Sequence, residues 1–451
     1  MEYYSTRDWN KFVDLDTVIL NGLAMDGGLY LPKKINKLSD DFWVSAPTLT
    51  YNQILIEVLK VLTDGDDYDF QEVSKNINEV FTFQPSIIKL VENRYLLDLN
   101  TGPTSAFKDY GANTLGVYLD NVAKAKKSNK TVLVATSGDT GSAVANAFKD
   151  YGDNPNIKVI VLYPKGRVSN DQRKLMTTVG GNITCLEVDG NFDDCQRLVK
   201  EAMSDDSIRA GLTSANSINL IRLYGQVAYY IYATSRIGLD KDIIFSVPSG
   251  NLGNLTAGYI AKQMGNPTSK FIVCHNSNDM FNSFILEGMM NNNQSSIQTI
   301  SSAMDVYRPS NLERLVVMFR GEYDTKGNIT KMPDIEKMQQ TFYVQGFNDE
   351  DTKVKMKEIN QTYGIEIDPH TAVGLLGVDH SINTEHPEFI NSTIITLSTA
   401  HASKFNEVFL EVNGKEAVTS SPIIYARAKK EVTINIPNQY KYLYDVIKTL
   451  N

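Results

Sequence analysis

The sequence is poor in the residues on which metal and disulfide sites depend. It has only three cysteines, Cys185, Cys195 and Cys274, and five histidines in 451 residues. The cysteines are odd in number and widely spaced, and no His-Glu-x-x-His motif occurs, so we expect neither a disulfide framework nor a metal site. Unpaired cysteines are typical of a reducing compartment, and we therefore expect a cytoplasmic protein.

Long apolar runs and an excess of basic charge are also missing. No apolar stretch reaches the roughly 18 residues that a membrane span requires. The opening residues, MEYYSTRDWNK, lack the basic start and apolar core of a secretion signal. The formal net charge is −9 and no basic face stands out, so we expect neither nucleic acid nor a membrane as a partner.

What is present indicates an α/β protein of more than one domain. A chain of 451 residues exceeds one ordinary core, and we expect its first ninety or so residues, which contain the stretch NGLAMDGGLYLP, to form a separate small unit. From Thr131, short β-branched runs such as TVLVAT, IKVIVLY and DIIFSVP alternate with amphipathic stretches. This alternation predicts helices layered on mostly parallel sheets, which bind ligands at the carboxyl ends of their strands.

Two glycine-containing turns follow such strands and precede expected helices. The first, TSGDTGS, spans 136–142, and the second, SGNLGN, spans 249–254. Free backbone N–H groups and the helix dipole at these positions favour a carboxylate or a phosphate. Neither turn is a Walker A motif or a complete G-x-G-x-x-G, so a capped helix start and a tight strand-to-helix turn remain the structural alternatives.

Lys108 lies in the stretch TGPTSAFKDYGAN, where a helix is expected to begin. Most lysines are solvated, but a lysine in an apolar pocket loses its charge readily and forms imines. Ala106, Phe107 and Tyr110 supply apolar neighbours here. Together with the two anion-binding turns, Lys108 indicates a cofactor that carries both an aldehyde and a phosphate.

The stretch GPTSAFKD resembles the lysine motif of threonine synthases, which are pyridoxal-phosphate enzymes of the tryptophan synthase β-like fold. The blocks ATSGDTGSA, LYPKGRVS, SANSINLIRLYGQ, VPSGNLGN, DPHTAVG and LSTAHASKF match that family in its order, and GLAMDGGLYLP matches its longer-chain branch. The resemblance covers nearly the whole chain and is weakest in the last forty or so residues.

The resemblance implies fold type II, with two open, mostly parallel sheets flanked by helices and a small N-terminal domain. Residues 1–92 would form the N-terminal extension. Residues 93–112 and 235–451 would form a large domain that binds the cofactor, and residues 113–234 a smaller mobile domain. Chemistry in a dry site predicts that the smaller domain closes over the substrate.

Cofactor contacts follow from the same resemblance. Lys108 would carry pyridoxal phosphate as a Schiff base and move protons at the substrate Cα and Cβ. Asp139 would lie beside the pyridine 3-oxygen, where relatives often have asparagine, and Thr399, with Ser398 second, would face the pyridine nitrogen. The phosphate would be held by the turn made of Ser249, Gly250, Asn251, Leu252, Gly253 and Asn254.

The substrate implied by the resemblance is O-phospho-L-homoserine, which loses phosphate from Cγ and gains water at Cβ to give L-threonine. Ser137 and Thr140 would hold the α-carboxylate. Asn216, Ser217 and Arg222 would hold the substrate phosphate, since a guanidinium fork suits a dianion.

Other readings of the same residues remain open. A surface helix position is the alternative for Arg222. Two other functions fit: a related lyase, such as a serine or threonine dehydratase or a cysteine synthase, and an inactive relative that binds a phosphorylated ligand. We leave His370 and His401 out of the catalytic set, because a lone histidine is more often structural. We expect a monomer or a homodimer.

Overall fold

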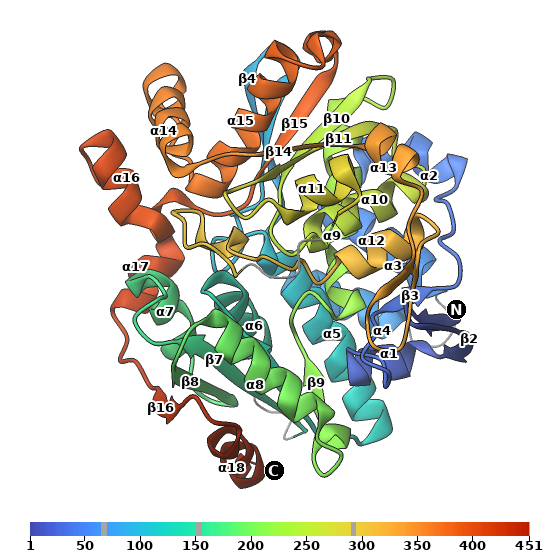
Figure 1. Ribbon diagram of the computed structural model, residues 1–451, viewed down its shortest axis with the longest axis vertical. Coiled ribbons are helices and arrows are strands. Elements are labelled where there is room, and N and C mark those ends of the chain that lie inside the picture. Colours follow the sequence, from blue (N-terminus) through green and yellow to red (C-terminus); the bar gives the residue numbers. More distant parts are fainter. Residues whose placement is uncertain (65–69, 150–155, 290–294, 451) are drawn as a thin grey trace.

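A computed structural model describes residues 1–64, 70–149, 156–289 and 295–450. Two open sheets organise them, one in the upper half of Figure 1 and one in the lower left. All strand pairs of the upper sheet are parallel except the last one. Its strands, in spatial order, are β14 (Phe342–Gly346), β11 (Thr268–His275), β10 (Ile243–Pro248), β15 (Thr393–Ser398), β5 (Arg94–Asp98) and β4 (Ser86–Val91).

The lower sheet has five strands, and all of its pairs are parallel. In spatial order they are β16 (Ile434–Pro437), β8 (Ile183–Asp189), β7 (Ile157–Pro164), β6 (Lys130–Ala135) and β9 (Leu212–Ser214). Every residue of β6 is buried. A strand covered by helices on both faces has this continuous burial, which explains why the β-branched run TVLVA has no polar alternation.

Helices follow the strands as the alternation predicts. Four belong to the segment around the lower sheet: α5 (Lys108–Lys126), α6 (Asp139–Lys149), α7 (Asn170–Thr177) and α8 (Phe192–Ser204). The others after them are α9 (Leu220–Ile237), α10 (Gly253–Gln263), α11 (Met280–Glu287), α12 (Leu312–Met318), α13 (Ile335–Thr341), α14 (Asp349–Tyr363), α15 (Pro369–Asn383), α16 (Asn406–Asn413), α17 (Ser421–Arg427) and α18 (Tyr440–Leu450). In the described ranges, no helix is both long and apolar enough to cross a bilayer.

The N-terminal segment packs against the buried central helices (Figure 1). It contains β1 (Tyr3–Ser5), β2 (Asp8–Val13), β3 (Tyr30–Pro32), α1 (Leu15–Asn21), α2 (Asp40–Ser45), α3 (Tyr51–Thr63) and α4 (Phe70–Val80). A capping box of Thr50 and Gln53 starts α3, which lies along α9. The ring of Tyr51 meets Tyr110 of α5 and Tyr232 of α9 edge to face. The N-terminal segment therefore shares the main core.

The C-terminal segment returns to the lower sheet, where Figure 1 shows β16 and α18 beside β8 and α8. Strand β16 pairs with β8 in parallel, and Leu443 and Ile447 of α18 lie in one apolar cluster with residues of β8. Amphipathic spacing on α18 explains this docking. These elements fall inside the range 235–451 that the sequence assigns to the larger domain, and β4 falls inside 1–92 although it belongs to the upper sheet. The domain boundaries stay a prediction.

Candidate active site

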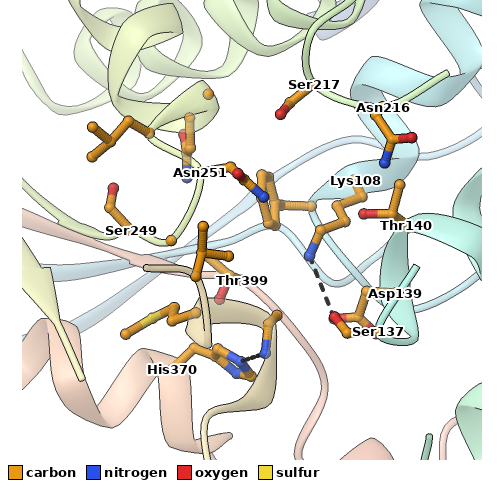
Figure 2. Close-up of a pocket in the computed structure, with 18 of the residues that line it drawn as sticks. Lys108, Ser137, Asp139, Thr140, Asn216, Ser217, Ser249, Asn251, His370 and Thr399 are labelled. Carbon is orange, nitrogen blue, oxygen red and sulfur yellow. Dashed lines mark hydrogen bonds and ion pairs between the residues drawn. The ribbon is translucent and has the colours of Figure 1, made fainter. Parts of the chain in front are cut away.

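One cavity lies where the carboxyl ends of β6, β10 and β15 meet the start of α5. Figure 2 shows Lys108 extending into it, with Ser249 and Thr399 on one side and Thr140 and Asn216 on the other. All of the site residues predicted from the sequence line this cavity: Lys108, Ser137, Asp139, Thr140, Asn216, Ser217, Arg222, Ser249, Gly250, Asn251, Leu252, Gly253, Asn254 and Thr399.

The loop before Lys108 is held by a buried carboxylate. Asp109 accepts hydrogen bonds from the Thr104 backbone N–H and hydroxyl at 2.8 and 2.6 Å. A Cβ at Gly102 would lie 2.5 Å from this carboxylate, so the loop requires glycine there. Burial raises the pKa of Asp109 to about 6, although the Thr104 bonds oppose the rise. Ser105 has a φ of 55°, a conformation that is strained for a serine and that the surrounding contacts maintain.

Lys108 is a largely enclosed amine. Its side chain is 15% exposed, and its Nζ lies 4.8 Å from the centre of the Phe107 ring and 3.8 Å from Asp139 Oδ2. Burial lowers the pKa of Lys108, and the nearby Lys404 and Arg222 cations lower it further, while Asp139 raises it. The net effect lowers the pKa of Lys108, which makes the uncharged amine more accessible, and this is the form that attacks an aldehyde or accepts a proton.

Asp139 stands between two lysines at the start of α6. Its Oδ1 lies 2.6 Å from Lys404 Nζ and accepts a hydrogen bond from Gln172 Nε2 at 2.8 Å. Burial alone would raise the pKa of Asp139, but the Lys404 and Lys108 ammonium groups hold it well below its usual range. The sequence does not single out Lys404, because nothing local distinguishes it from a solvated lysine.

The turn between β10 and α10 has the properties of a phosphate site. Leu252 adopts a left-handed φ of 58° directly before the helix, and the first N–H groups of a helix have no partner within it. Ser249 Oγ and Asn254 Nδ2 are buried without a hydrogen-bond partner. Tyr229 and Tyr230 donate to Asn254 Oδ1 at 2.5 and 2.7 Å, which leaves the Asn254 amide nitrogen available. These donors fit the phosphate of pyridoxal phosphate.

A second set of groups suited to an anion surrounds Arg222, which is 2% exposed on α9. Its Nη1 donates to the Ala215 carbonyl at 2.6 Å and its Nε has no partner. Burial lowers the pKa of Arg222 to about 10, although the charge of Asp109 opposes the change, and no carboxylate of the described residues lies within ion-pair distance of it. A buried guanidinium without a close ion pair suits an anionic ligand. Of its predicted companions, Asn216 is bonded to the Ala135 backbone, and Ser217 accepts from Asn311.

Two further elements complete the wall of the cavity. The Thr399 carbonyl accepts from the Phe107 N–H at 2.9 Å, so the end of β15 is joined to the lysine loop. His370 donates from Nδ1 to Asp368, and its Nε2 accepts from the Ala303 N–H at 3.1 Å. Figure 2 shows His370 at the wall of the cavity. His370 thus supports the turn at Ala303, which also lines the cavity. No cluster of three or more metal-ligating side chains occurs among the residues described.

Comparisons with known proteins agree with this geometry. The sequence profile of the family described as "Pyridoxal-phosphate dependent enzyme" matches residues 89–399, and that described as "Threonine synthase N terminus" matches residues 2–81. The threonine synthase of Buchnera aphidicola subsp. Baizongia pistaciae is 34% identical over 417 residues, which cover 91% of each chain.

Solved structures extend this similarity to the whole fold. The crystal structure of threonine synthase from Escherichia coli superposes with a TM-score of 0.88 at 31% identity, covering 100% of both chains. The pyridoxal-phosphate-bound threonine synthase from Brucella melitensis superposes with a TM-score of 0.89 at 30% identity, covering 100% of this chain and 99% of that one.

The fold and the cavity, with the matching profile, place the chain among the pyridoxal-phosphate-dependent enzymes. Within this class the chain belongs to the threonine synthase family, because its relatives are similar over nearly their full length. The predictions of fold class, cofactor and enzyme family are confirmed. The roles of individual residues and the domain boundaries stay predictions.

Proposed function

We propose that this cavity converts O-phospho-L-homoserine and water into L-threonine and phosphate. The observation that carries the proposal is the meeting of three features in one cavity. These are Lys108 with its lowered pKa, the Ser249–Asn254 turn with unpartnered donors, and the buried cation of Arg222. Two separate sites for anions are what a phosphorylated cofactor and a phosphorylated substrate require.

The residues that would hold pyridoxal phosphate come from four segments. The turn Ser249–Asn254 would take the phosphate, Lys108 the aldehyde carbon, and Asp139 and Thr399 would contact the ring. When bound, the cofactor supplies an electron sink for charge that develops at the substrate α-carbon. The Thr399 hydroxyl cannot stabilise a protonated ring nitrogen as a carboxylate would, which tempers that sink and disfavours transamination.

The chain's own groups would orient the substrate and move its protons. Ser137 and Thr140, at the N-terminus of α6, would hold the α-carboxylate. Arg222, with Ser217 and Asn216, would bind the phosphate and keep it in place as it leaves. The Lys108 amine would take the proton from Cα and would then move the proton at Cβ, because burial favours its uncharged form.

We also propose a domain division and a location for the protein. We keep 1–92, 93–112 with 235–451, and 113–234 as the proposed units, and the existence of two separate sheets supports closure between the last two. A cytoplasmic location is supported by Cys185, Cys195 and Cys274, which are free and buried thiols.

Product analysis of the purified enzyme tests the proposal. With pyridoxal phosphate and O-phospho-L-homoserine, we expect phosphate and L-threonine in equal amounts, and loss of both products in Lys108→Ala. Lys124→Ala, an exposed lysine on the same helix, is the matched control and should retain activity. Release of a 2-oxo acid in place of threonine would identify a related lyase instead. A protein that binds the cofactor but releases no phosphate would contradict the proposal.

A further inference from the structure

Lys404 is a fully buried cation close to the cavity. Its side chain is 0% exposed, and its Nζ lies 2.6 Å from Asp139 Oδ1 and donates to the Thr104 carbonyl at 2.7 Å. Lys404 lies in the short 3-10 helix Ala402–Phe405 that follows β15, whereas Asp139 starts α6 beside the other sheet. A fully desolvated lysine is costly unless its partner is well placed, so this arrangement calls for a function.

The two oxygens of Asp139 face different lysines. Oδ1 forms the close pair with Lys404, and Oδ2 lies 3.8 Å from Lys108 Nζ. Gln172 adds a hydrogen bond to the Oδ1 side at 2.8 Å. The Asp139–Lys404 ion pair is shorter and is supported by the extra donor. The electrostatic interaction of Asp139 with Lys108 is therefore the weaker of the two.

We propose that Lys404 is a positioning residue that holds Asp139 in an ion pair and thereby leaves Lys108 free to give up its proton. This inference rests on the proposed role of Lys108 as the cofactor-bearing lysine. Without Lys404, the Asp139 carboxylate would be an uncompensated buried anion, and its natural counter-ion would be protonated Lys108. A lysine held in that state is a poor nucleophile and a poor base.

The charges around Lys108 support this assignment. The charged groups that shift its pKa are Asp139 on α6, Lys404 in the 3-10 helix after β15, Arg222 on α9 and Asp368 at the start of α15. Among them, Lys404 and Arg222 lower the pKa of Lys108, while Asp139 and Asp368 raise it. Lys404 therefore lowers the pKa of Lys108 directly, as a like charge, and indirectly, because it forms an ion pair with Asp139.

A pH titration of the absorbance of the bound cofactor tests this role without turnover. In Lys404→Met we expect the midpoint to rise by about one pH unit or more, which corresponds to a tenfold change in the proton equilibrium. Lys404→Arg should stay near the wild-type midpoint because it keeps the charge. Lys124→Met removes a lysine that is also 2.6 Å from a buried aspartate, Asp120, and should leave the midpoint unchanged.

A double-mutant comparison separates the indirect effect from general damage. In an Asp139→Asn background, Lys404→Met should shift the midpoint less than in wild type, because only the direct effect of the like charge remains once the carboxylate of Asp139 is gone. Kinetically, Lys404→Met should lower kcat with little change in KM, since Lys404 does not contact the proposed phosphate site. If Lys404→Met does not fold, Lys404→Gln tests the same midpoint.

An unmoved midpoint in Lys404→Met, or an equal shift in Lys124→Met, would overturn the assignment of Lys404. Failure of the proposed function has a different signature, since the titration requires no substrate. A shifted midpoint in a protein that releases no phosphate would remove the proposed reaction and leave the role of Lys404 intact.

Discussion

The side-chain amide of Asn311 donates to the Ser217 hydroxyl at 3.1 Å. The same amide also donates to the Asn251 carbonyl at 3.0 Å, and its oxygen accepts from Arg314 at 2.6 Å. Arg314 is fully buried and donates in addition to the Tyr30 carbonyl of the N-terminal segment. One side chain therefore joins the proposed substrate-phosphate residues to the cofactor-phosphate turn, and the N-terminal segment supports that junction.

Replacing Asn311 by alanine should disturb both phosphate sites together. We expect KM for O-phospho-L-homoserine and the dissociation constant of pyridoxal phosphate each to rise about fivefold or more, because a lost buried hydrogen bond costs about 1 kcal/mol or more. Steady-state kinetics and cofactor titration measure the two effects. Asn78→Ala, at an exposed position of α4, should change neither. A change in only one of the two constants would show that Asn311 does not couple the sites.

Arg222→Ala removes the buried cation assigned to the substrate phosphate. We expect KM for O-phospho-L-homoserine to rise at least about tenfold, since truncating one partner of a buried charge pair costs about 2–5 kcal/mol. Arg197→Ala, an exposed arginine on α8, serves as the control and should leave KM unchanged. If the enzyme turns over L-serine, which carries no phosphate, the rate of that reaction should be the same in wild type and Arg222→Ala. An unchanged KM would show that Arg222 has a structural role and does not bind the substrate phosphate.

Gly250 allows the cofactor-phosphate turn to approach a neighbouring loop. A Cβ at this position would lie 2.8 Å from the Ala303 carbonyl oxygen and 2.9 Å from Met304 Cα, so Gly250→Ala must displace backbone. We expect pyridoxal phosphate to bind about tenfold more weakly, as a shift worth about 1.4 kcal/mol would produce. Gly211→Ala has open space around its Cβ and should bind the cofactor normally. Equal affinities in the two variants would argue against a tightly fitted turn.

Because His275 is buried, we expect it to reduce the stability of the protein in acid. Burial lowers its pKa to about 4, although its bond to the Ser249 carbonyl opposes the change. Because the folded pKa lies below the unfolded value of about 6.5, the unfolded chain takes up the proton first as pH falls. Stability is thus lost between about pH 6.5 and pH 4. Urea unfolding at pH 6.5 and 4.5 should show about 2 kcal/mol more loss in wild type than in His275→Gln.

The comparison isolates His275 because Asp109 and Asp305 are present in both proteins. Burial raises the pKa of each of these carboxyl groups to about 6, so they change stability in the opposite direction over the same range. An identical loss in wild type and His275→Gln would mean that His275 is not held neutral in the folded protein.

The sequence predicts the parts of the site that depend on local patterns. Buried parallel strands are continuous β-branched runs, and the glycine turns after them occupy the carboxyl ends where ligands bind, so the turn at Ser249–Asn254 and the loop at Lys108 could be located in advance. Their meeting in one cavity follows from the resemblance to a known family, not from any local signal.

Residues that act through distant contacts could not be located in this way. Lys404 bonds to Thr104, which lies 300 residues earlier in the chain, and Asn311 bridges segments that no periodicity connects. The same limit explains the C-terminal strand β16, whose place beside β8 depends on pairing between remote segments. A buried lysine and a solvated lysine are alike in sequence, so only the fold separates Lys404 from Lys124.

We propose that Lys108, and no other lysine, carries the cofactor. Borohydride reduction of the enzyme with bound pyridoxal phosphate, followed by peptide mass mapping, tests this most directly, because reduction fixes the cofactor to the lysine that holds it. We expect the added mass on the peptide containing Lys108 alone. The same mass on the peptide containing Lys404, or on no single peptide, would contradict it.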